Sequence, residues 1–374
     1  MSVTNTLVLD NGSYTIKLGY AGTQGELQSV PNLVGRNRRT GQLYVADEID
    51  KHATWNQFTM RSPFERGYIT NWDLQLTVWD RLFSDQVLAL APLDTRLVVT
   101  EPLLNLENIQ NGYDEVLFEE FGFGQIVRAP AVSLAAYNPI QSILTPTITD
   151  TRPGCLGAEC ITVVDLGHAA TFIAPFFRGK LCRSAIRKID VGGKLLTNYL
   201  KETVSFRQWN MMDETGVVGH IKETGCFITT DIDRDLKVCK RAPHRNTLTL
   251  AYVLPNLTES QSGYVKSIGG QLTDQGRDHQ DAQGEQILMM DNERFTVPEV
   301  LFYPSDIGIR QKGLAEAIVE SVSATPVAFQ GLMYANIIVM GGGAGFPGLR
   351  ERLMAELRPL VPEEYLIRIG VPDR

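Results

Sequence analysis

Two segments of the chain share a pattern that suits phosphate chemistry. Residues 7–20 read LVLDNGSYTIKLGY, and residues 162–175 read TVVDLGHAATFIAP. In each, an apolar run ends at an aspartate, Asp10 or Asp165, and a turn containing glycine leads into a second run. Glycine lets backbone N–H groups face an anion, a strand-end aspartate suits hydrated Mg²⁺, and Lys17 could reach a phosphate. Taken alone, DNG is more typical of a type I′ hairpin, so the functional interpretation depends on the duplication.

A third glycine segment matches a dinucleotide-binding motif only in its letters. MGGGAGFPG, at residues 340–348, contains G-x-G-x-x-G between a predicted strand and a predicted helix. A dinucleotide-binding unit needs a further strand with an acidic residue about 20 positions later, but Glu363 and Glu364 follow a proline-containing loop. The G-x-x-x-x-G-K-[ST] pattern of a P-loop is also missing. Both of these nucleotide folds are therefore disfavoured.

Length and composition indicate a two-domain or two-lobed globular protein. The chain has 374 residues, 43% hydrophobic and 21% charged, and a net charge of −8, which argues against a nucleic-acid coat protein. Its first residues lack the pattern of a secretory signal, and no run approaches the ~18 apolar residues of a membrane helix. The five cysteines lack zinc-type pairing, since CLGAEC (155–160) has no second pair, and we expect reduced thiols.

The segments around these motifs predict the elements that position them. We expect strands over the first 25 residues and at 95–105, and a helix at 71–85 with Asn71 as N-cap. The proline-rich stretch 138–160 is predicted to be a loop between lobes, and the polar stretch 256–285 a surface insertion. Two short basic clusters are more typical of solvated loops than of nucleic-acid contacts. They comprise Arg36, Arg38 and Arg39, and Lys237, Lys240, Arg241 and Arg245.

Taken in order, several segments resemble landmarks of the actin family across nearly the whole chain. These are LVLDNGSYTIKLGYAG, PNLVGR, GYITNWD, VVTEPLLN, FTVPEVLFYPS and VMGGGAGFPG. The resemblance implies an α/β fold of the actin, Hsp70 and sugar-kinase type, with two duplicated lobes and a central nucleotide cleft. Further segments, including VLFEEFGF and SFRQWNMMDET, resemble one nuclear subfamily of the actin-related proteins.

The resemblance places a nucleotide site on matching residues of this chain. It implies a first phosphate loop at Asp10, Asn11, Gly12, Ser13 and Tyr14, with its lysine at Lys17, and a second phosphate loop at Asp165 and Gly167. It also implies an adenine-side pair at Lys222 and Glu223, and a late glycine turn, where the purine packs, at Gly341, Gly342 and Phe346. The lysine–glutamate pair is also compatible with an ordinary surface pair. We expect ATP or ADP, with Mg²⁺, to be structural if bound.

Departures from the family pattern fall on its catalytic positions. Tyr14 replaces a glycine and would crowd the terminal phosphate, while His168 replaces an aspartate. Pro130 replaces the glutamine that orients the attacking water, and Phe172 replaces the histidine that assists it. Gly219 replaces an arginine beside the adenosine. Because phosphoryl transfer to water depends on orienting that nucleophile, we predict no catalytic residues and negligible hydrolysis.

The resemblance also predicts the lobes. Residues 1–137 would form lobe one, with subdomains 1 and 2, and residues 138–374 lobe two, with subdomains 3 and 4. Only residues 37–43 separate VGR from YVADEID, where actin has a longer polymerisation loop. Actin would continue beyond GVPDR to complete subdomain 1, so we expect that completion to be missing and apolar surface to be left for a partner.

The function implied is that of a non-catalytic scaffold subunit of a Swr-type chromatin-remodelling complex, which exchanges a histone variant into nucleosomes. The expected partners are the motor ATPase, a zinc-finger HIT subunit and, through the complex, the nucleosome. The expected location is nuclear, with some protein in the cytoplasm before import. The alternatives are a filament-forming actin relative, an ATPase or a sugar kinase of the same superfamily.

Overall fold

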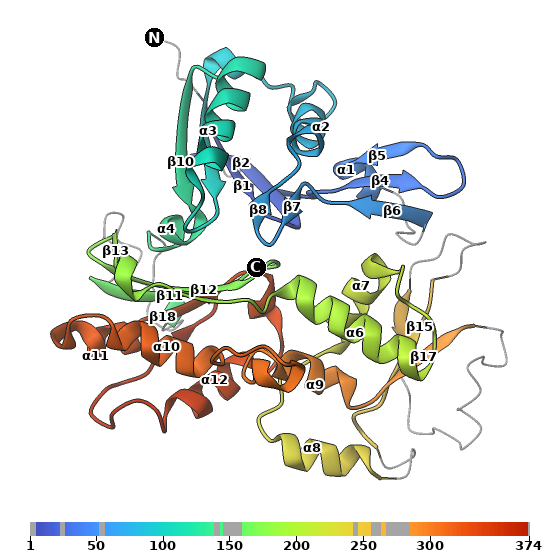
Figure 1. Cartoon of the computed structure of the whole chain (residues 1–374), viewed down its shortest axis with the longest axis vertical. Coiled ribbons are helices and arrows are strands. Elements are labelled where there is room, and N and C mark those ends of the chain that lie inside the picture. The colour runs from blue at the N-terminus through green and yellow to red at the C-terminus, as the bar shows by residue number, and fades with distance from the viewer. Residues whose placement is uncertain are drawn as a thin grey trace. The chain divides into compact units, whose positions relative to one another are not determined.

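The computed structural model describes residues 5–22, 27–51, 57–137, 143–144, 159–241, 246–255, 263–266 and 285–372 (Figure 1). The described residues up to Tyr137 form one compact unit, called unit 1, and those from Ile143 onward form a second, called unit 2. None of the described helices is both long and apolar enough to cross a membrane.

Unit 1 is built on a five-stranded sheet with the order β10-β9-β1-β2-β3. The central strand β1 is antiparallel to β2 and parallel to β9; β2 is antiparallel to β3, and β9 is parallel to β10. One face buries Leu7, Leu9 and Val99 against Trp79 of α2 and Tyr113 of α3. The bounds are β1 Asn5–Asn11, β2 Thr15–Tyr20, β3 Gln28–Pro31, β9 Thr95–Glu101, β10 Gln125–Pro130, α2 Trp72–Phe83 and α3 Glu107–Glu115.

The other parts of unit 1 are small. The predicted cap of α2 is confirmed, because the Asn71 side chain accepts a hydrogen bond from the Leu74 backbone N–H at 3.0 Å. Residues 38–42 join β4 to β5 in a second, three-stranded sheet of order β5-β4-β6. The bounds are β4 Val34–Asn37, β5 Leu43–Val45, α1 Asp47–Asp50, β6 Phe58–Arg61, β7 Phe64–Glu65, β8 Tyr68–Ile69 and α4 Ala131–Ala135, and α3 continues as a π-helical segment, Val116–Glu120.

Unit 2 repeats the sheet of unit 1. Its order is β13-β12-β11-β18-β19, with β14 also paired to β12. The central strand β11 is antiparallel to β12 and parallel to β18, β12 is antiparallel to β13, and β18 is parallel to β19. The bounds are β11 Cys160–Leu166, β12 Thr171–Phe177, β13 Lys180–Leu181, β14 Arg187–Ile189, β18 Ile337–Met340 and β19 Ile369–Gly370. Both units therefore use one strand arrangement, as a duplicated fold requires.

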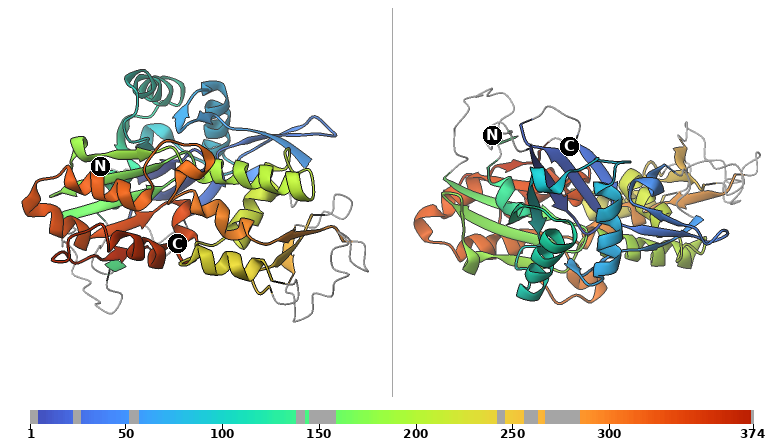
Figure 2. Two further views of the ribbon diagram at one scale, coloured as in Figure 1. Left: turned by 60° about the horizontal axis from the view of Figure 1, so that its bottom comes forward. Right: turned by 90° about the horizontal axis from the view of Figure 1, so that it is seen from above.

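Helices complete unit 2. α10 and α11 pack on the sheet, and α12 packs against α10 and β19 (Figure 2). Tyr264–Lys266, inside the stretch predicted as an insertion, form strand β16 and pair with β15; residues 256–262 and 267–284 lie outside the described residues. Most of the loop predicted at 138–160 lies outside them as well. The bounds are α6 Gly193–Arg207, α7 Thr215–Gly225, α8 Ile232–Cys239, β15 Leu250–Val253, β17 Ile287–Met290, α9 Glu293–Glu299, α10 Leu314–Ser323, α11 Val327–Ala335 and α12 Leu349–Leu357.

A buried ion pair joins α12 to α9. The Arg352 guanidinium donates from Nη2 to Glu299 Oε1 at 2.7 Å and from Nη1 to the Thr229 carbonyl at 2.7 Å. Both charged side chains are almost fully buried, and Arg352 Nε also donates to Glu356 Oε1 at 2.8 Å. Removing one partner of such a pair leaves an uncompensated buried charge. The pair therefore fixes the position of α12 in unit 2.

Candidate functional site

The first aspartate hairpin has a four-residue turn. Asn11 pairs with Ile16 across β1 and β2, which leaves residues 12–15 to connect the strands. Gly12 is outside the left-handed region, so the two-residue type I′ alternative is wrong. A Cβ atom at Gly12 would lie 2.6 Å from the Thr15 carbonyl oxygen, and the Gly12 N–H donates to the Asp10 carbonyl at 3.0 Å. Glycine is therefore required here by close approach of the backbone.

A network of hydrogen-bonded side chains holds the Asp10 carboxylate in place. The Thr100 hydroxyl donates to Asp10 Oδ1 at 2.7 Å and accepts from the Asn11 backbone N–H at 2.9 Å. Asn11 Nδ2 donates to the Tyr113 hydroxyl at 2.9 Å, and Asn32 Nδ2 donates to Asn11 Oδ1 at 3.3 Å. Burial raises the pKa of the Tyr113 phenol, which stays protonated. Sequence reasoning missed Thr100, Asn32 and Tyr113; the position of Thr100 near the end of a buried strand was the available signal.

The second hairpin has the same four-residue turn, but a different residue faces its aspartate. Leu166 pairs with Thr171, so residues 167–170 again form a four-residue turn. A Cβ atom at Gly167 would lie 2.9 Å from the Ala170 carbonyl oxygen. Asp10 faces Lys17 in the first register, whereas Asp165 faces Phe172 in the second. The duplicated position therefore carries a cation in unit 1 and an aromatic ring in unit 2.

The late glycine turn closes on Asp165 within unit 2. Strand β18 ends at Met340, directly beside Asp165 in the parallel register. Gly341 follows with φ of 90°, and a Cβ atom there would lie 2.5 Å from the Leu166 carbonyl oxygen and 2.7 Å from Asp165 Oδ1. Next along the chain, Gly342 has open space around it. Of the two predicted glycines, it is thus Gly341 that lies close to the Asp165 carboxylate. The third predicted residue of this turn, Phe346, is half-buried against the core of unit 2.

Lys222 and His168 lie together beside Gly193. The buried Lys222 ammonium donates to the Gly193 carbonyl at 3.1 Å and to Thr197 Oγ1 at 2.9 Å. A Cβ atom at Gly193 would lie 3.6 Å from Lys222 Nζ and 3.3 Å from His168 Nδ1. Within the described part of the chain no carboxylate forms an ion pair with Lys222, and Glu223 beside it is exposed. Two of the three N–H donors of the ammonium are thus used, and one remains for an acceptor on a ligand.

Burial and charge determine the protonation of these two groups. Burial lowers the pKa of Lys222, which the nearby Glu223 charge partly opposes. Burial and then the charges of Lys222 and Lys194 lower the pKa of His168 to about 3. His168 is therefore neutral at pH 7, and it supplies no negative charge at the position where the family pattern has an aspartate.

Of the other departures, Pro130, Phe172 and Gly219 have no polar side chain. Pro130 ends β10 and precedes α4, so it has neither a backbone N–H nor a polar side chain. Phe172 lies on β12 opposite Asp165, and Gly219 lies on the buried side of α7. The Tyr14 side chain is partly buried, and its carbonyl accepts from the Asn32 N–H at 2.8 Å. Among the described residues, no group of three or more His, Cys, Asp or Glu side chains could hold a metal.

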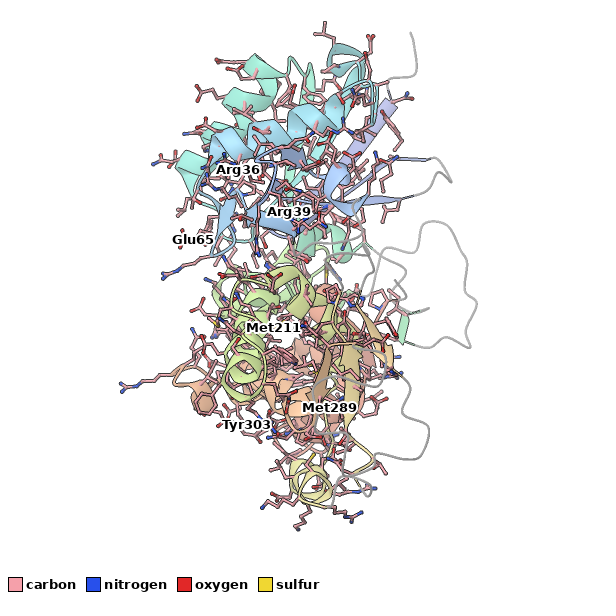
Figure 3. All side chains as sticks on the ribbon, turned by 90° about the vertical axis from the view of Figure 1, so that its right-hand side faces the viewer. Arg36, Arg39, Glu65, Met211, Met289 and Tyr303 are labelled. Carbon is pink, nitrogen blue, oxygen red and sulfur yellow. The ribbon has the colours of Figure 1, made fainter. Side chains whose placement is uncertain are left out.

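The predicted basic clusters occupy exposed surfaces. Arg36 lies on β4 and Arg39 lies in the short turn that follows it (Figure 3). Lys237 lies on α8, and Lys240 follows its end. Arg245 lies outside the described residues. The described members of both clusters are thus exposed, as expected of solvated positions.

Comparisons with known proteins agree with this geometry. The family model described as actin matches residues 1–374. Actin-like protein ARP6 of Cryptococcus neoformans is 38% identical over 99% of this chain and 76% of its own length. Actin-related protein 6 of Drosophila melanogaster is 36% identical over 98% of this chain and 89% of its own, and actin-like protein ARP6 of Yarrowia lipolytica is 38% identical over 98% and 87%.

The duplicated sheets, the paired aspartate hairpins and the full-length match establish that the chain belongs to the actin family. Within that family it is similar to the proteins named actin-related protein 6 or actin-like protein ARP6. The predicted fold class is confirmed.

A methyl group at Gly341 should disrupt the Asp165 loop. Gly341→Ala places a Cβ against two oxygen atoms at a left-handed backbone position, so we expect a loss of about 2–4 kcal/mol in the free energy of unfolding. The matched control is Gly342→Ala, whose Cβ meets open space. Chemical denaturation followed by circular dichroism measures both. Equal stability of the two variants would contradict the close approach.

His168 should contribute to acid sensitivity. The unfolded chain protonates this histidine below pH 6.5, whereas the folded chain keeps it neutral down to about pH 3, so acid favours unfolding. Between pH 7 and pH 5 the free energy of unfolding should fall by about 2 kcal/mol from this group alone. His168→Gln should lose that part of the pH dependence, while His220→Gln should retain it. The idea fails if the His168 variant keeps the full pH dependence of the parent chain.

Proposed function

We propose that this chain is a non-catalytic, actin-fold scaffold subunit of a Swr-type chromatin-remodelling complex that exchanges a histone variant into nucleosomes. The observation that carries the non-catalytic part is the contrast between phosphate-loop geometry that is kept and water-positioning groups that are replaced. The assignment to a remodelling complex rests on the resemblance of the sequence segments to the nuclear subfamily.

The buried Lys222 and the glycine loops support a bound nucleotide. Lys222 carries a buried charge whose contacts within the described residues are a carbonyl and a hydroxyl, which leaves the ammonium able to meet an anion. Gly12, Gly167 and Gly341 hold the strand-end loops in shapes that exclude side chains. We infer that Lys222 and the Asp165 loop of unit 2 would contact ATP or ADP, with Mg²⁺ accompanying the phosphates, in a structural role, and the resemblance to the actin family assigns the Asp10 loop to the same nucleotide.

Replacement of the water-positioning groups supports the absence of hydrolysis. An attacking water needs a fixed acceptor, and losing such groups commonly costs about 10²–10⁵ in rate. Pro130 and Phe172 have neither a side-chain acceptor nor a donor, and neutral His168 replaces a carboxylate. The same residues weigh against a sugar kinase, which also needs an oriented nucleophile.

The short β4–β5 turn favours a role as a subunit of a complex over a role as a filament-forming protein. Residues 38–42 are held in a tight connection, since the Gly41 N–H donates to the Asn37 carbonyl at 2.9 Å. Such a turn has no length to insert into a neighbouring subunit. The partners we propose are the motor ATPase and the zinc-finger HIT subunit, with the nucleosome reached through the complex in the nucleus.

The isolated chain should not hydrolyse ATP. With saturating ATP and Mg²⁺, we expect phosphate release to stay at the level of buffer, because Pro130 and Phe172 have no polar side chain with which to orient water. Sensitive phosphate detection over hours measures this, with muscle-type actin as the positive control. Actin-like turnover that disappears in Asp165→Ala would show that the proposal of a degenerate site is wrong.

The tagged chain should purify from nuclei with a remodelling motor and its zinc-finger subunit. Mass spectrometry of the purified complex identifies these partners, and the nucleotide released from the same sample can be identified by chromatography. Sedimentation of the isolated chain with ATP and Mg²⁺ serves as the second arm. A pelletable polymer, or a nuclear sample without any motor ATPase, would contradict the scaffold assignment.

A further inference from the structure

Unit 2 has a surface pocket that belongs to neither aspartate loop. The pocket has a volume of about 250 Å³ and lies between the segment that follows α9 and the end of α12. Its floor is formed by buried Phe302 and Ala315, and its rim by Tyr303 and Leu360, which are 45% and 44% exposed. The volume is below the roughly 300–1,000 Å³ of small-molecule sites and suits one inserted side chain.

Rigid backbone shapes this pocket. A Cβ atom at Gly313 would lie 1.7 Å from the Phe302 carbonyl oxygen, so the two segments touch without room for a side chain. Pro304 and Pro359 form parts of the wall, and proline fixes its own backbone angle. The Tyr303 ring, labelled in Figure 3, therefore stands on a stiff segment rather than covering the pocket as a loose flap.

The charge of the rim has one sign. Two glutamates, Glu316 and Glu356, line the pocket, and none of the described lining residues is a lysine or arginine. Glu316 is exposed and forms no ion pair with a described cation. Glu356 accepts through Oε1 from Arg352, but Arg352 is already neutralised by the buried Glu299. Lys312, next to the lining residue Gly313, is paired at 2.6 Å with Glu320, which also pairs with Arg187 at 2.8 Å, so the acidic character of the rim rests on Glu316 and Glu356.

We propose that this pocket docks a segment of a partner protein in which one large apolar side chain is flanked by arginine or lysine. The apolar side chain would enter between Tyr303 and Leu360 and be removed from water there. The flanking cations would meet Glu316 and Glu356 at the exposed rim, where solvent weakens each ion pair. The surface is independent of the proposed nucleotide, so it stands or falls separately from the scaffold assignment.

Synthetic peptides test this docking surface on the full chain. The probe is a fluorescein-labelled Gly/Ser peptide with a central leucine flanked on each side by two arginines, and the comparison peptide has glutamates at the flanks. Fluorescence anisotropy at low salt should show at least about tenfold tighter binding of the arginine peptide, which corresponds to about 1.4 kcal/mol. Equal affinities, or no binding of the arginine peptide at millimolar protein, would overturn the proposal.

Matched variants locate the binding. Leu360→Ser and Tyr303→Ser should each weaken binding of the arginine peptide severalfold, whereas Leu366→Ser, which removes a leucine exposed outside the pocket, should not.

The charged variants test the rim. Glu316→Lys should reduce the preference for arginine flanks. Glu351→Lys, which changes an exposed glutamate on α12 outside the pocket, should leave that preference unchanged. If Glu316→Lys and Glu351→Lys reduced the preference for the arginine peptide equally, the preference would reflect net charge alone and the proposed site would be wrong. Concentration-dependent self-association that Leu360→Ser abolishes would assign the pocket to a second copy of the chain instead.

Discussion

Around each strand-end aspartate, the backbone approaches so closely that the adjoining turn has no room for a side chain. At Gly12 and Gly167 the obstacle is a carbonyl oxygen of the same turn, and at Gly341 it is the carbonyl and carboxylate of the neighbouring strand. The four-residue turns, the parallel strands beside them and the positions of Asp10 and Asp165 all depend on this spacing. The fold can therefore keep the loops only while it keeps the glycines, whether or not chemistry takes place there.

Both units contain this close approach of the backbone at their glycines, but the residues that face the two aspartates differ in charge. Lys17 faces Asp10, while Phe172 faces Asp165. Unit 2 places its cation elsewhere, on the buried Lys222 beside neutral His168. Each unit therefore carries a cation of its own close to its aspartate hairpin, and in unit 2 the residue that faces the aspartate has neither a donor nor an acceptor.

The sequence predicted those features that depend on local pattern. The capped helix α2, the paired hairpins and the strand–glycine turn–helix at β18 follow from periodicity and from residues with special backbone properties. The network of Thr100, Asn32 and Tyr113 could not be predicted, because strand register brings together residues up to 102 positions apart. Strand β16 was missed because three residues within a polar stretch carry little signal. The acidic pocket depends on the contact of Gly313 with Phe302, which no pattern along the chain reveals.

The network beneath Asp10 also bears on the order in which the protein acquires its structure during synthesis. Its members, from Asp10 to Tyr113, all come from the first 113 residues, and they bond to one another through side chains and the first turn. Domains generally fold as units while the chain emerges from the ribosome. The first loop can therefore take its final shape before the residues of the second loop have been translated.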